Sequence, residues 1–210
     1  MSSKQKSIIR VSVSAVLFSA IAFTQELDIT KGFDAVVSGF VSAFSSDLTA
    51  AVNIFITSLA SPLLMVLYCS ALMLLPKTRM LIGLPIAIAM IIQVLINSTL
   101  KSVFMRARPE FGALVIEYGY SFPSGHAMAS MVLATCLKIL LTSEKPNLQA
   151  LSNVLWIFPL IIGLSRVYLG VHFASDVLAG WAAGYCVAYL SLSALNKIKA
   201  YAASKRSGSN

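Results

Sequence analysis

The sequence predicts an all-α, polytopic membrane protein with six transmembrane helices, and its composition supports this fold class. Hydrophobic residues make up 58% of the 210 residues and charged residues only 11%, whereas soluble domains carry roughly 45–50% apolar and about 25% charged residues. The mean hydropathy of the chain is +0.83. Apolar segments of about 20 residues, the length that a helix needs to cross a bilayer, also recur along the chain. We expect a single domain over residues 1–210.

The apolar runs indicate where the six spans lie. We predict transmembrane helices over residues 8–24, 52–75, 80–98, 124–142, 151–169 and 173–193. The first run follows a basic N-terminal segment, and Ala20-Ile21-Ala22 resembles the cleavage site of a secretory signal. We favour an uncleaved first helix, and cleavage would leave the remaining topology unchanged.

The segment between the first two spans predicts a short amphipathic helix at the outer membrane interface. Its apolar residues recur at helical spacing, and its polar residues fall off this stripe. The stripe comprises Phe33, Val36, Val37, Phe40, Val41 and Phe44, and the polar residues are Asp34, Ser38 and Ser45. Two roles remain open for residues 32–46, a packing strut or a lip over which a lipid enters.

The distribution of charge predicts which way the spans run. With the N-terminus in the cytoplasm, the inner side carries Lys4, Lys6, Arg10, Lys77, Arg79, Lys138, Lys145, Lys197, Lys199, Lys205 and Arg206, and the outer side carries Lys31, Lys101, Arg106, Arg108 and Arg166. This excess of inner cations is what the positive-inside rule requires. We therefore expect a multi-pass protein of the inner (plasma) membrane with both termini in the cytoplasm. Much of the net charge of +8 lies in short tails and loops beside the spans, so it does not indicate a nucleic-acid partner.

Antiparallel threading brings a group of polar residues to the outer membrane face. They are Lys101, Arg106 and Arg108 after the third span, Ser124, Gly125 and His126 at the start of the fourth, Arg166 near the end of the fifth, and His172 and Asp176 at the start of the sixth. Cations at membrane depth are energetically costly and usually functional. Their joint placement predicts one extracytoplasmic site.

Three of these cations predict a binding site for a phosphoryl group. The guanidinium groups of Arg108 and Arg166 can bind its oxygens in a bidentate manner, and Lys101 adds a point charge. The helix that begins at Gly125 adds backbone N–H donors, and Ser124 can donate its hydroxyl. Taken alone, Ser124 could be only a helix N-cap and Arg166 only an interfacial arginine, so the prediction depends on their joint placement.

The two histidines predict a division of labour at the phosphate. One can attack phosphorus as a neutral nucleophile, and the other can protonate the leaving oxygen. His172 and Asp176 are four residues apart, hence on one helical face, and the carboxylate can hold Nδ1–H so that Nε2 is free to attack. His126 lacks such a partner and fits the general acid. A purely structural pair of His172 and Asp176 is the alternative.

We expect no metal or other cofactor, because the pattern lacks a set of metal ligands and three cations can neutralise the developing charge. Arg106 has no role in this scheme. We interpret it as a contact to a lipid headgroup or to solvent.

These residues resemble the three signature motifs of the type 2 phosphatidic acid phosphatase superfamily. The motifs read Lys101-x6-Arg108-Pro109, Pro123-Ser124-Gly125-His126 and Ser165-Arg166-x5-His172-x3-Asp176. The resemblance implies a metal-independent lipid phosphatase with a six-helix transmembrane core. It also implies roles: His172 as the nucleophile that becomes phosphohistidine, Asp176 as its orienting partner, His126 as the general acid, and Lys101, Arg108, Ser124, Gly125 and Arg166 as the phosphate cradle.

The resemblance does not decide the lipid substrate. The chain is similar to small bacterial enzymes that act on phosphatidylglycerol phosphate or undecaprenyl pyrophosphate, and an outward-facing site suits both, as it suits phosphatidic acid. A phosphotransferase that passes the phosphoryl group to a lipid or sugar hydroxyl remains an alternative. So does a non-catalytic phosphate-binding membrane protein. The oligomeric state is not predicted.

Overall fold

A computed structural model describes residues 3–110 and 112–207. Over these residues the chain forms helices and loops and no β-strand, so the all-α prediction is confirmed. Five helical segments are long and apolar enough to cross a membrane: Gln5–Thr24, Pro76–Phe104, Gly125–Glu144, Leu151–Tyr168 and Ala174–Ile198. The number rises to six when the bent pair Asp28–Ser42 and Asp47–Ser58 is counted as one span.

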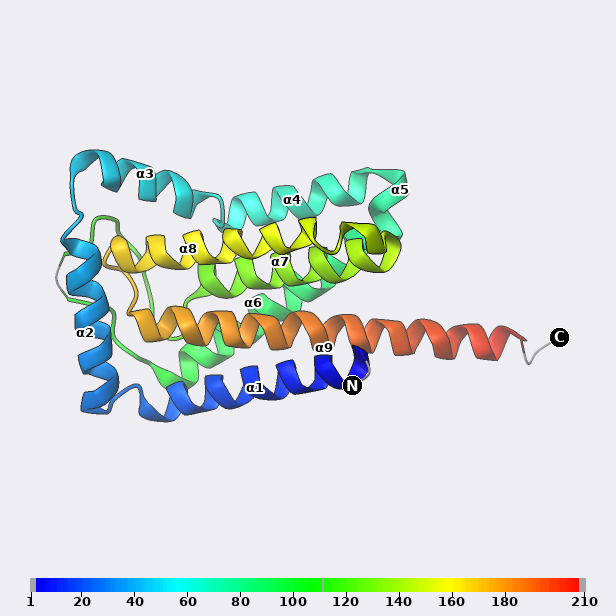
Figure 1. Ribbon diagram of the computed structural model, residues 1–210, viewed down its shortest axis with the longest axis horizontal. Coiled ribbons are helices and arrows are strands. Elements are labelled where there is room, and N and C mark those ends of the chain that lie inside the picture. Colours follow the sequence, from blue (N-terminus) through cyan, green and yellow to red (C-terminus); the bar gives the residue numbers. More distant parts are fainter. Residues whose placement is uncertain (1–2, 111, 208–210) are drawn as a thin grey trace.

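The helix α7 (Gly125–Glu144) is the centre of the bundle. It packs against α6 (Leu84–Phe104), α8 (Ile157–Tyr168) and α9 (Ala174–Ser207). The first helix, α1 (Ser3–Thr24), lies along α9 (Figure 1). The beginnings of α7 and α9 and the end of α8 therefore reach the same end of the bundle, where the predicted site residues lie.

The second predicted span, residues 52–75, consists of two helices, so the prediction of one continuous helix is wrong. α3 (Asp47–Ser58) is followed by a break, and α4 (Pro62–Leu74) begins at a proline. The Ser61 hydroxyl caps α4 by accepting a hydrogen bond from the backbone of its first turn. Proline is favourable at the first position of a helix but cannot donate a hydrogen bond in its interior. The short helical segments are α5 (Pro76–Thr78), η1 (Arg79–Gly83), η2 (Pro146–Leu148) and η3 (Leu151–Trp156).

The predicted amphipathic helix is present as α2 (Asp28–Ser42), which runs across the end of the bundle (Figure 1). Its axis makes an angle of 119° with that of α3. Val37 and Val41 of α2 pack against residues of α7, α8 and α9. Asp34 lies on the same inner face and is buried, whereas the aromatic part of the stripe, Phe33 and Phe40, is exposed. The side of α2 that contacts the protein is therefore partly polar.

Two glycines of α9 allow its backbone to touch that of α7. A Cβ atom at Gly180 would lie 2.7 Å from the carbonyl oxygen of Ser124, and one at Gly184 would lie 2.6 Å from that of Met128. Any other side chain would force the two helices apart. At the same end, the Ser124 N–H donates to the carbonyl oxygen of Asp176 at 3.0 Å. The starts of α7 and α9 are thus held in fixed register.

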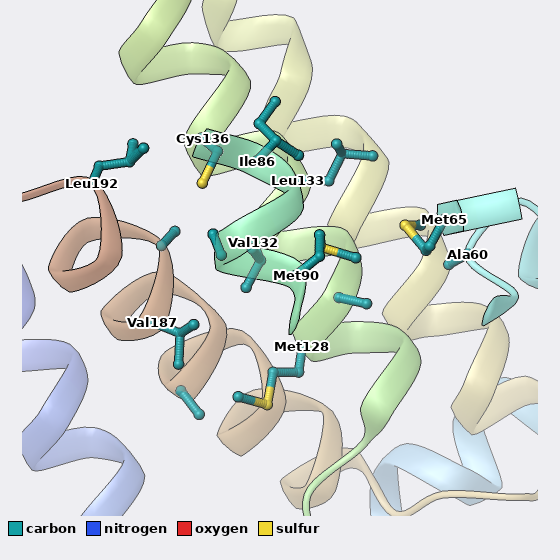
Figure 2. Packing of buried hydrophobic residues seen from close by; sticks show 14 of the residues in the cluster. Ala60, Met65, Ile86, Met90, Met128, Val132, Leu133, Cys136, Val187 and Leu192 are labelled. Carbon is teal, nitrogen blue, oxygen red and sulfur yellow. The ribbon is translucent and has the colours of Figure 1, made fainter. Parts of the chain in front are cut away.

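The main hydrophobic core lies along α7 and joins it to α4, α6 and α9 (Figure 2). Its members include Met65, Ile86, Met90, Met128, Val132, Cys136, Val187 and Leu192. In Figure 2 the side chains of Met128, Val132 and Cys136 follow one another along α7. Close packing of this kind leaves little freedom for relative movement of the helices. It gives the polar end of α7 a rigid base.

Candidate active site

The structure brings the predicted site residues together at one end of the bundle. Lys101 lies in the last turn of α6, Arg108 in the α6–α7 loop, Ser124, Gly125 and His126 at the start of α7, Arg166 in the last turn of α8, His172 before α9 and Asp176 in the first turn of α9. Lys101 is close enough to interact electrostatically with Arg108, Asp176 and Arg166. His126 interacts in the same way with Arg166, His172 and Arg108.

His172 is held by its Nδ1 atom and presents its Nε2 atom to a cation. Nδ1 lies 3.4 Å from Oδ2 of Asp176 and 3.3 Å from the hydroxyl oxygen of Ser121. Because an ionised carboxylate only accepts hydrogen bonds, Nδ1 carries the proton. Nε2 is then unprotonated, and it lies 3.2 Å from Nη1 of Arg108. This is the tautomer that a nucleophilic histidine needs.

The contact between His172 and Asp176 does not depend on a shared helical face, so that part of the sequence reasoning is wrong. α9 begins at Ala174, which follows His172. Asp176 reaches back over the start of the helix, and its Oδ2 accepts a hydrogen bond from the Phe173 N–H at 2.9 Å. The carboxylate therefore caps α9 and holds the histidine at the same time.

Burial keeps His172 neutral. The side chain is almost fully buried. Burial lowers the pKa of His172 to about 4, although the hydrogen bond and the charge of Asp176 act in the opposite direction. Water-excluded surroundings disfavour the protonated imidazole. At neutral pH the Nε2 lone pair is thus free of a proton.

Arg166 is only 1% exposed. Its Nη1 donates to the hydroxyl of Thr57 at 2.8 Å, and its Nη2 donates to Oε1 of Glu117. The Nε atom has no hydrogen-bond partner among the described residues. A buried N–H without an acceptor is costly, so this group favours the binding of an anion.

Backbone carbonyl groups fix the guanidinium of Arg108. Nε donates to Gly119 O at 3.0 Å, Nη2 to Tyr118 O at 3.1 Å, and Nη1 to Val171 O at 2.8 Å. Nη2 also lies 3.8 Å from Oε2 of Glu117. The loop that carries Arg108 and the residue before His172 therefore hold each other in place.

Glu117 is a residue of the site that sequence reasoning missed. Its carboxylate lies between the guanidinium groups of Arg166 and Arg108. Burial alone would raise the pKa of Glu117, but the charge and hydrogen bond of Arg166, followed by the charges of His126 and Arg108, outweigh it and lower the pKa. Glu117 is ionised and makes an anion–cation contact of the kind that a phosphate oxygen would make. Glu117 lies between the first and second motifs, so their residue spacing does not point to it.

The start of α7 provides a buried hydroxyl group that caps nothing. Ser124 precedes the helix, but its side chain makes no capping hydrogen bond. The hydroxyl is fully buried and finds no partner in the part of the chain that the structure describes. The simple N-cap alternative therefore does not describe Ser124. The ammonium group of Lys101 donates to the backbone carbonyl oxygens of Tyr120 and Ser121, which shortly precede Ser124 in the chain.

Arg106 is buried, so its interpretation as a lipid or solvent contact is wrong. Its exposed fraction is 6%. Nη1 lies 2.6 Å from Oδ1 of Asp176, and Nη2 lies 2.9 Å from Oδ2 of Asp34 on α2. Two carboxylates compensate the cost of burying this cation.

An apolar groove of about 730 Å³ leads away from the site between α4 and α6. Met65 and Val66 line one wall, and Met90 and Val94 line the other. Its polar end is formed by Lys101, Gly125 and His126. A second hollow, of about 520 Å³, lies beside α2 and is lined by Asp34, Arg106, Arg108 and His172 among others. The site thus joins an apolar channel to a polar opening.

Three named phosphatases are similar to this chain in sequence. Phosphatidylglycerophosphatase B of Bacillus subtilis is 37% identical over 111 residues, which cover 51% of this chain and 55% of the relative. Undecaprenyl-diphosphatase of Sulfolobus acidocaldarius is 34% identical over 134 residues, which cover 59% and 60%. Lipid A 4′-phosphatase of Porphyromonas gingivalis is 28% identical over 140 residues, which cover 62% and 56%. The alignments therefore span little more than half of the length of these relatives.

Two crystal structures share the fold. The transmembrane PAP2-type phosphatidylglycerolphosphate phosphatase of Bacillus subtilis superposes with a TM-score of 0.78 at 27% identity, covering 90% of this chain and 97% of that one. Aquifex aeolicus LpxE superposes with a TM-score of 0.65 at 23% identity, covering 76% and 94%. The second likeness bears on the fold alone.

The sequence pattern of the PAP2 superfamily matches residues 82–200, a stretch that contains all three motifs and the helices that carry them. Because this match covers more than half of the 210 residues, the chain belongs to the PAP2 superfamily.

Proposed function

We propose that this protein is a lipid phosphatase, which removes a terminal phosphate from membrane lipid phosphates or diphosphates. One observation carries the proposal: the unprotonated Nε2 of His172 lies 3.2 Å from Nη1 of Arg108. A nucleophile and a cation that binds phosphoryl oxygens therefore face the same point. The three relatives, all phosphatases, support the same class of reaction.

In the first step the phosphoryl group binds among the cations, and His172 attacks it. Lys101, Arg108 and Arg166 neutralise the equatorial oxygens, and the free hydroxyl of Ser124 donates to one of them. Nε2 forms a bond to phosphorus while the bond between phosphorus and the lipid oxygen breaks. The leaving oxygen takes a proton from His126.

In the second step water hydrolyses the phosphohistidine. His126, now neutral, accepts a proton from the attacking water, and the P–N bond breaks as inorganic phosphate forms. The ring of His172 regains its neutral state, and Asp176 stabilises its positive charge in the intermediate through Nδ1–H. The reaction balances without a metal ion, because side-chain cations carry the electrostatic role.

The apolar groove supports a lipid as the substrate. A hydrocarbon chain fits between α4 and α6, with its phosphorylated end at Lys101 and His126. Groove walls of methionine and valine favour such a chain because the contact removes apolar surface from water. The candidates are undecaprenyl pyrophosphate, phosphatidylglycerol phosphate and phosphatidic acid.

We place the site on the extracytoplasmic side of the inner membrane. The support is the excess of Lys and Arg on the opposite side, which orients short-looped membrane proteins. In Figure 1 the start of α1 and the end of α9 lie away from α2, which crosses the site end of the bundle. Substrates reach such a site from the outer leaflet.

Phosphate release tests the proposal. The purified protein in detergent is given each of the three candidate lipids with labelled terminal phosphate, and free phosphate and labelled lipids are separated. We expect free phosphate from at least one lipid, and none with the His172→Ala variant. Label that appears on a second lipid would indicate a phosphotransferase instead. Bound label without turnover would indicate a phosphate-binding protein.

A further inference from the structure

The carboxylate of Asp176 has a second set of contacts, on the side away from His172. Oδ1 of Asp176 accepts a hydrogen bond from Nη1 of Arg106 at 2.6 Å, whereas Oδ2 faces His172, Ser121 and Phe173. The two oxygens therefore have different partners. Arg106 fixes the plane of the carboxylate and with it the direction in which Oδ2 points.

Arg106 is in turn held by Asp34 of α2. Nη2 of Arg106 lies 2.9 Å from Oδ2 of Asp34, so the guanidinium bridges two carboxylates. Its central carbon also lies 4.2 Å from the centre of the Phe173 ring, a cation–π contact. With a carboxylate at each terminal nitrogen, the guanidinium has one orientation.

Asp34 is also bound to Ser175, the residue that precedes Asp176. Its Oδ1 accepts from the Ser175 N–H at 2.8 Å, and its Oδ2 accepts from the Ser175 hydroxyl at 2.7 Å. Asp34 is 2% exposed and Asp176 is fully buried. The polar contact of α2 with the bundle is thus made with the first turn of α9, where Asp176 lies.

We propose that Arg106 and Asp34 are positioning residues, which orient Asp176 and through it the Nδ1–H tautomer of His172. The proposal rests on the phosphatase function proposed above. It gives α2 a part in catalysis: the helix supplies the outer anchor of a chain of contacts from Asp34 through Arg106 and Asp176 to His172. Asp34 lies outside the three motifs, and Arg106 stands at one of the unspecified positions between Lys101 and Arg108 of the first motif.

Asp34→Asn tests the proposal with the smallest change of shape. The asparagine keeps an acceptor for the Ser175 N–H but turns an N–H₂ group toward Arg106, which then loses its second carboxylate. Since small misplacement of a catalytic group can cost about 10²-fold in rate, we expect kcat to fall about 10- to 100-fold, with KM unchanged within about twofold. Arg106→Gln should show the same split with a larger loss.

The matched control is Asp28→Asn. It removes the same charge from the same helix at an exposed position, and we expect wild-type kcat and KM. The double variant Asp34→Asn, Arg106→Gln removes one charge of each sign. Arg106→Gln alone leaves the buried carboxylate of Asp34 without its cation, and this variant can fail to fold. The double variant removes that carboxylate as well, so kcat and KM can still be measured.

A spectroscopic measurement separates positioning from a general loss of structure. The chain has two histidines, so ¹⁵N-histidine spectra of His126→Gln protein without a histidine tag report on His172 alone. We expect mainly the Nδ1–H tautomer, and a mixture of tautomers when Asp34→Asn is added. The proposal is supported only if kcat falls at constant KM and the tautomer ratio changes; any other result with Asp34→Asn overturns it. Absence of phosphate release by the wild-type protein would instead refute the phosphatase function, and the tautomer measurement still stands without activity.

Discussion

The carboxylate of Glu117 receives a hydrogen bond from the guanidinium of Arg166, the most deeply buried cation of the site. The same carboxylate lies 3.8 Å from Arg108. Glu117 therefore occupies the guanidinium groups of Arg166 and Arg108, which we propose bind the phosphoryl group of the substrate. We expect a phosphoryl group that binds there to displace the carboxylate or to share its donors, so that Glu117 competes with anions for Arg166 and Arg108.

Replacement of Glu117 by glutamine should tighten the binding of phosphate. Removal of the competing charge frees Arg166 and Arg108, and the loss of one charged hydrogen bond corresponds to about a 10-fold change in affinity. We expect the inhibition constants of phosphate and of vanadate to fall by about that factor. Glu144→Gln, at an exposed position at the opposite end of α7, is the control. Unchanged inhibition by both anions would show that Glu117 does not compete.

His172 should remain neutral well below the ordinary pKa of a histidine. The pKa is lowered from 6.5 to about 4 by burial, so the ring takes up a proton only as the pH falls to that region. In ¹⁵N spectra of the His126→Gln protein, the single histidine should show no titration between pH 8 and pH 6. Asp176→Asn removes a group that raises the pKa, and the midpoint should move lower still. A midpoint near 6.5 would contradict the assigned burial and tautomer.

The two histidines should respond differently to the leaving group. His172→Ala cannot form a covalent intermediate and should be inactive with every substrate. His126→Ala lacks only the proton donor, which contributes roughly 10²–10⁴-fold, so nitrophenyl phosphate, whose leaving group needs no proton, should recover activity on that scale. Relative rates between variants are compared, because a water-soluble substrate uses little of the groove. The assignment is reversed if acid-quenched enzyme keeps labelled phosphate in His172→Ala and loses it in His126→Ala.

Chelation of metal ions should leave the activity unchanged. In the proposed mechanism, Lys101, Arg108 and Arg166 supply the positive charge that metal ions supply in many phosphoryl-transfer enzymes. We expect the same rate of phosphate release before and after treatment with excess EDTA. Loss of activity that added Mg²⁺ restores would refute the metal-independent mechanism.

A cysteine at position 116 should be accessible from outside the cell. Ile116 is 81% exposed and lies in the α6–α7 loop, beside Glu117. In a variant without the native Cys69, Cys136 and Cys186, an impermeant thiol reagent should label Ile116→Cys in intact cells. Labelling only after permeabilisation would place the site in the cytoplasm. A cysteine at Lys77, in the segment between α4 and α6, serves as the opposite control.

Sequence patterns predict the bundle and most of the residues that meet at its end. Apolar runs identify the long helices because a membrane requires length and hydrophobicity, which are local properties. The break before Pro62 is also local, since a proline inside a predicted helix indicates where it ends or begins. The prediction failed there because the apolar run continues through the proline.

The missed residues depend on contacts between distant segments. Asp34 falls on the polar side of a helical pattern, and its contacts with Arg106 and Ser175, 72 and 141 residues away, explain why that side faces inward. Glu117 and Ser121 lie in an irregular loop, where periodicity carries no information. Their positions follow from the path of the loop over Arg108 and His172, which no short motif encodes.

The contact of Gly180 and Gly184 with α7 divides the site into a fixed wall and an adaptable one. On the fixed wall, Ser124 and the start of α9 share backbone contacts, so the groups that perform the chemistry move as one body. The adaptable wall is the part of α4 that lines the groove opposite α6, where Met65 and Val66 present their side chains. Residues of α4 can therefore be exchanged to suit a different lipid tail while the spacing between nucleophile and cations stays the same. An enzyme built in this way can change its lipid preference without redesigning its reaction.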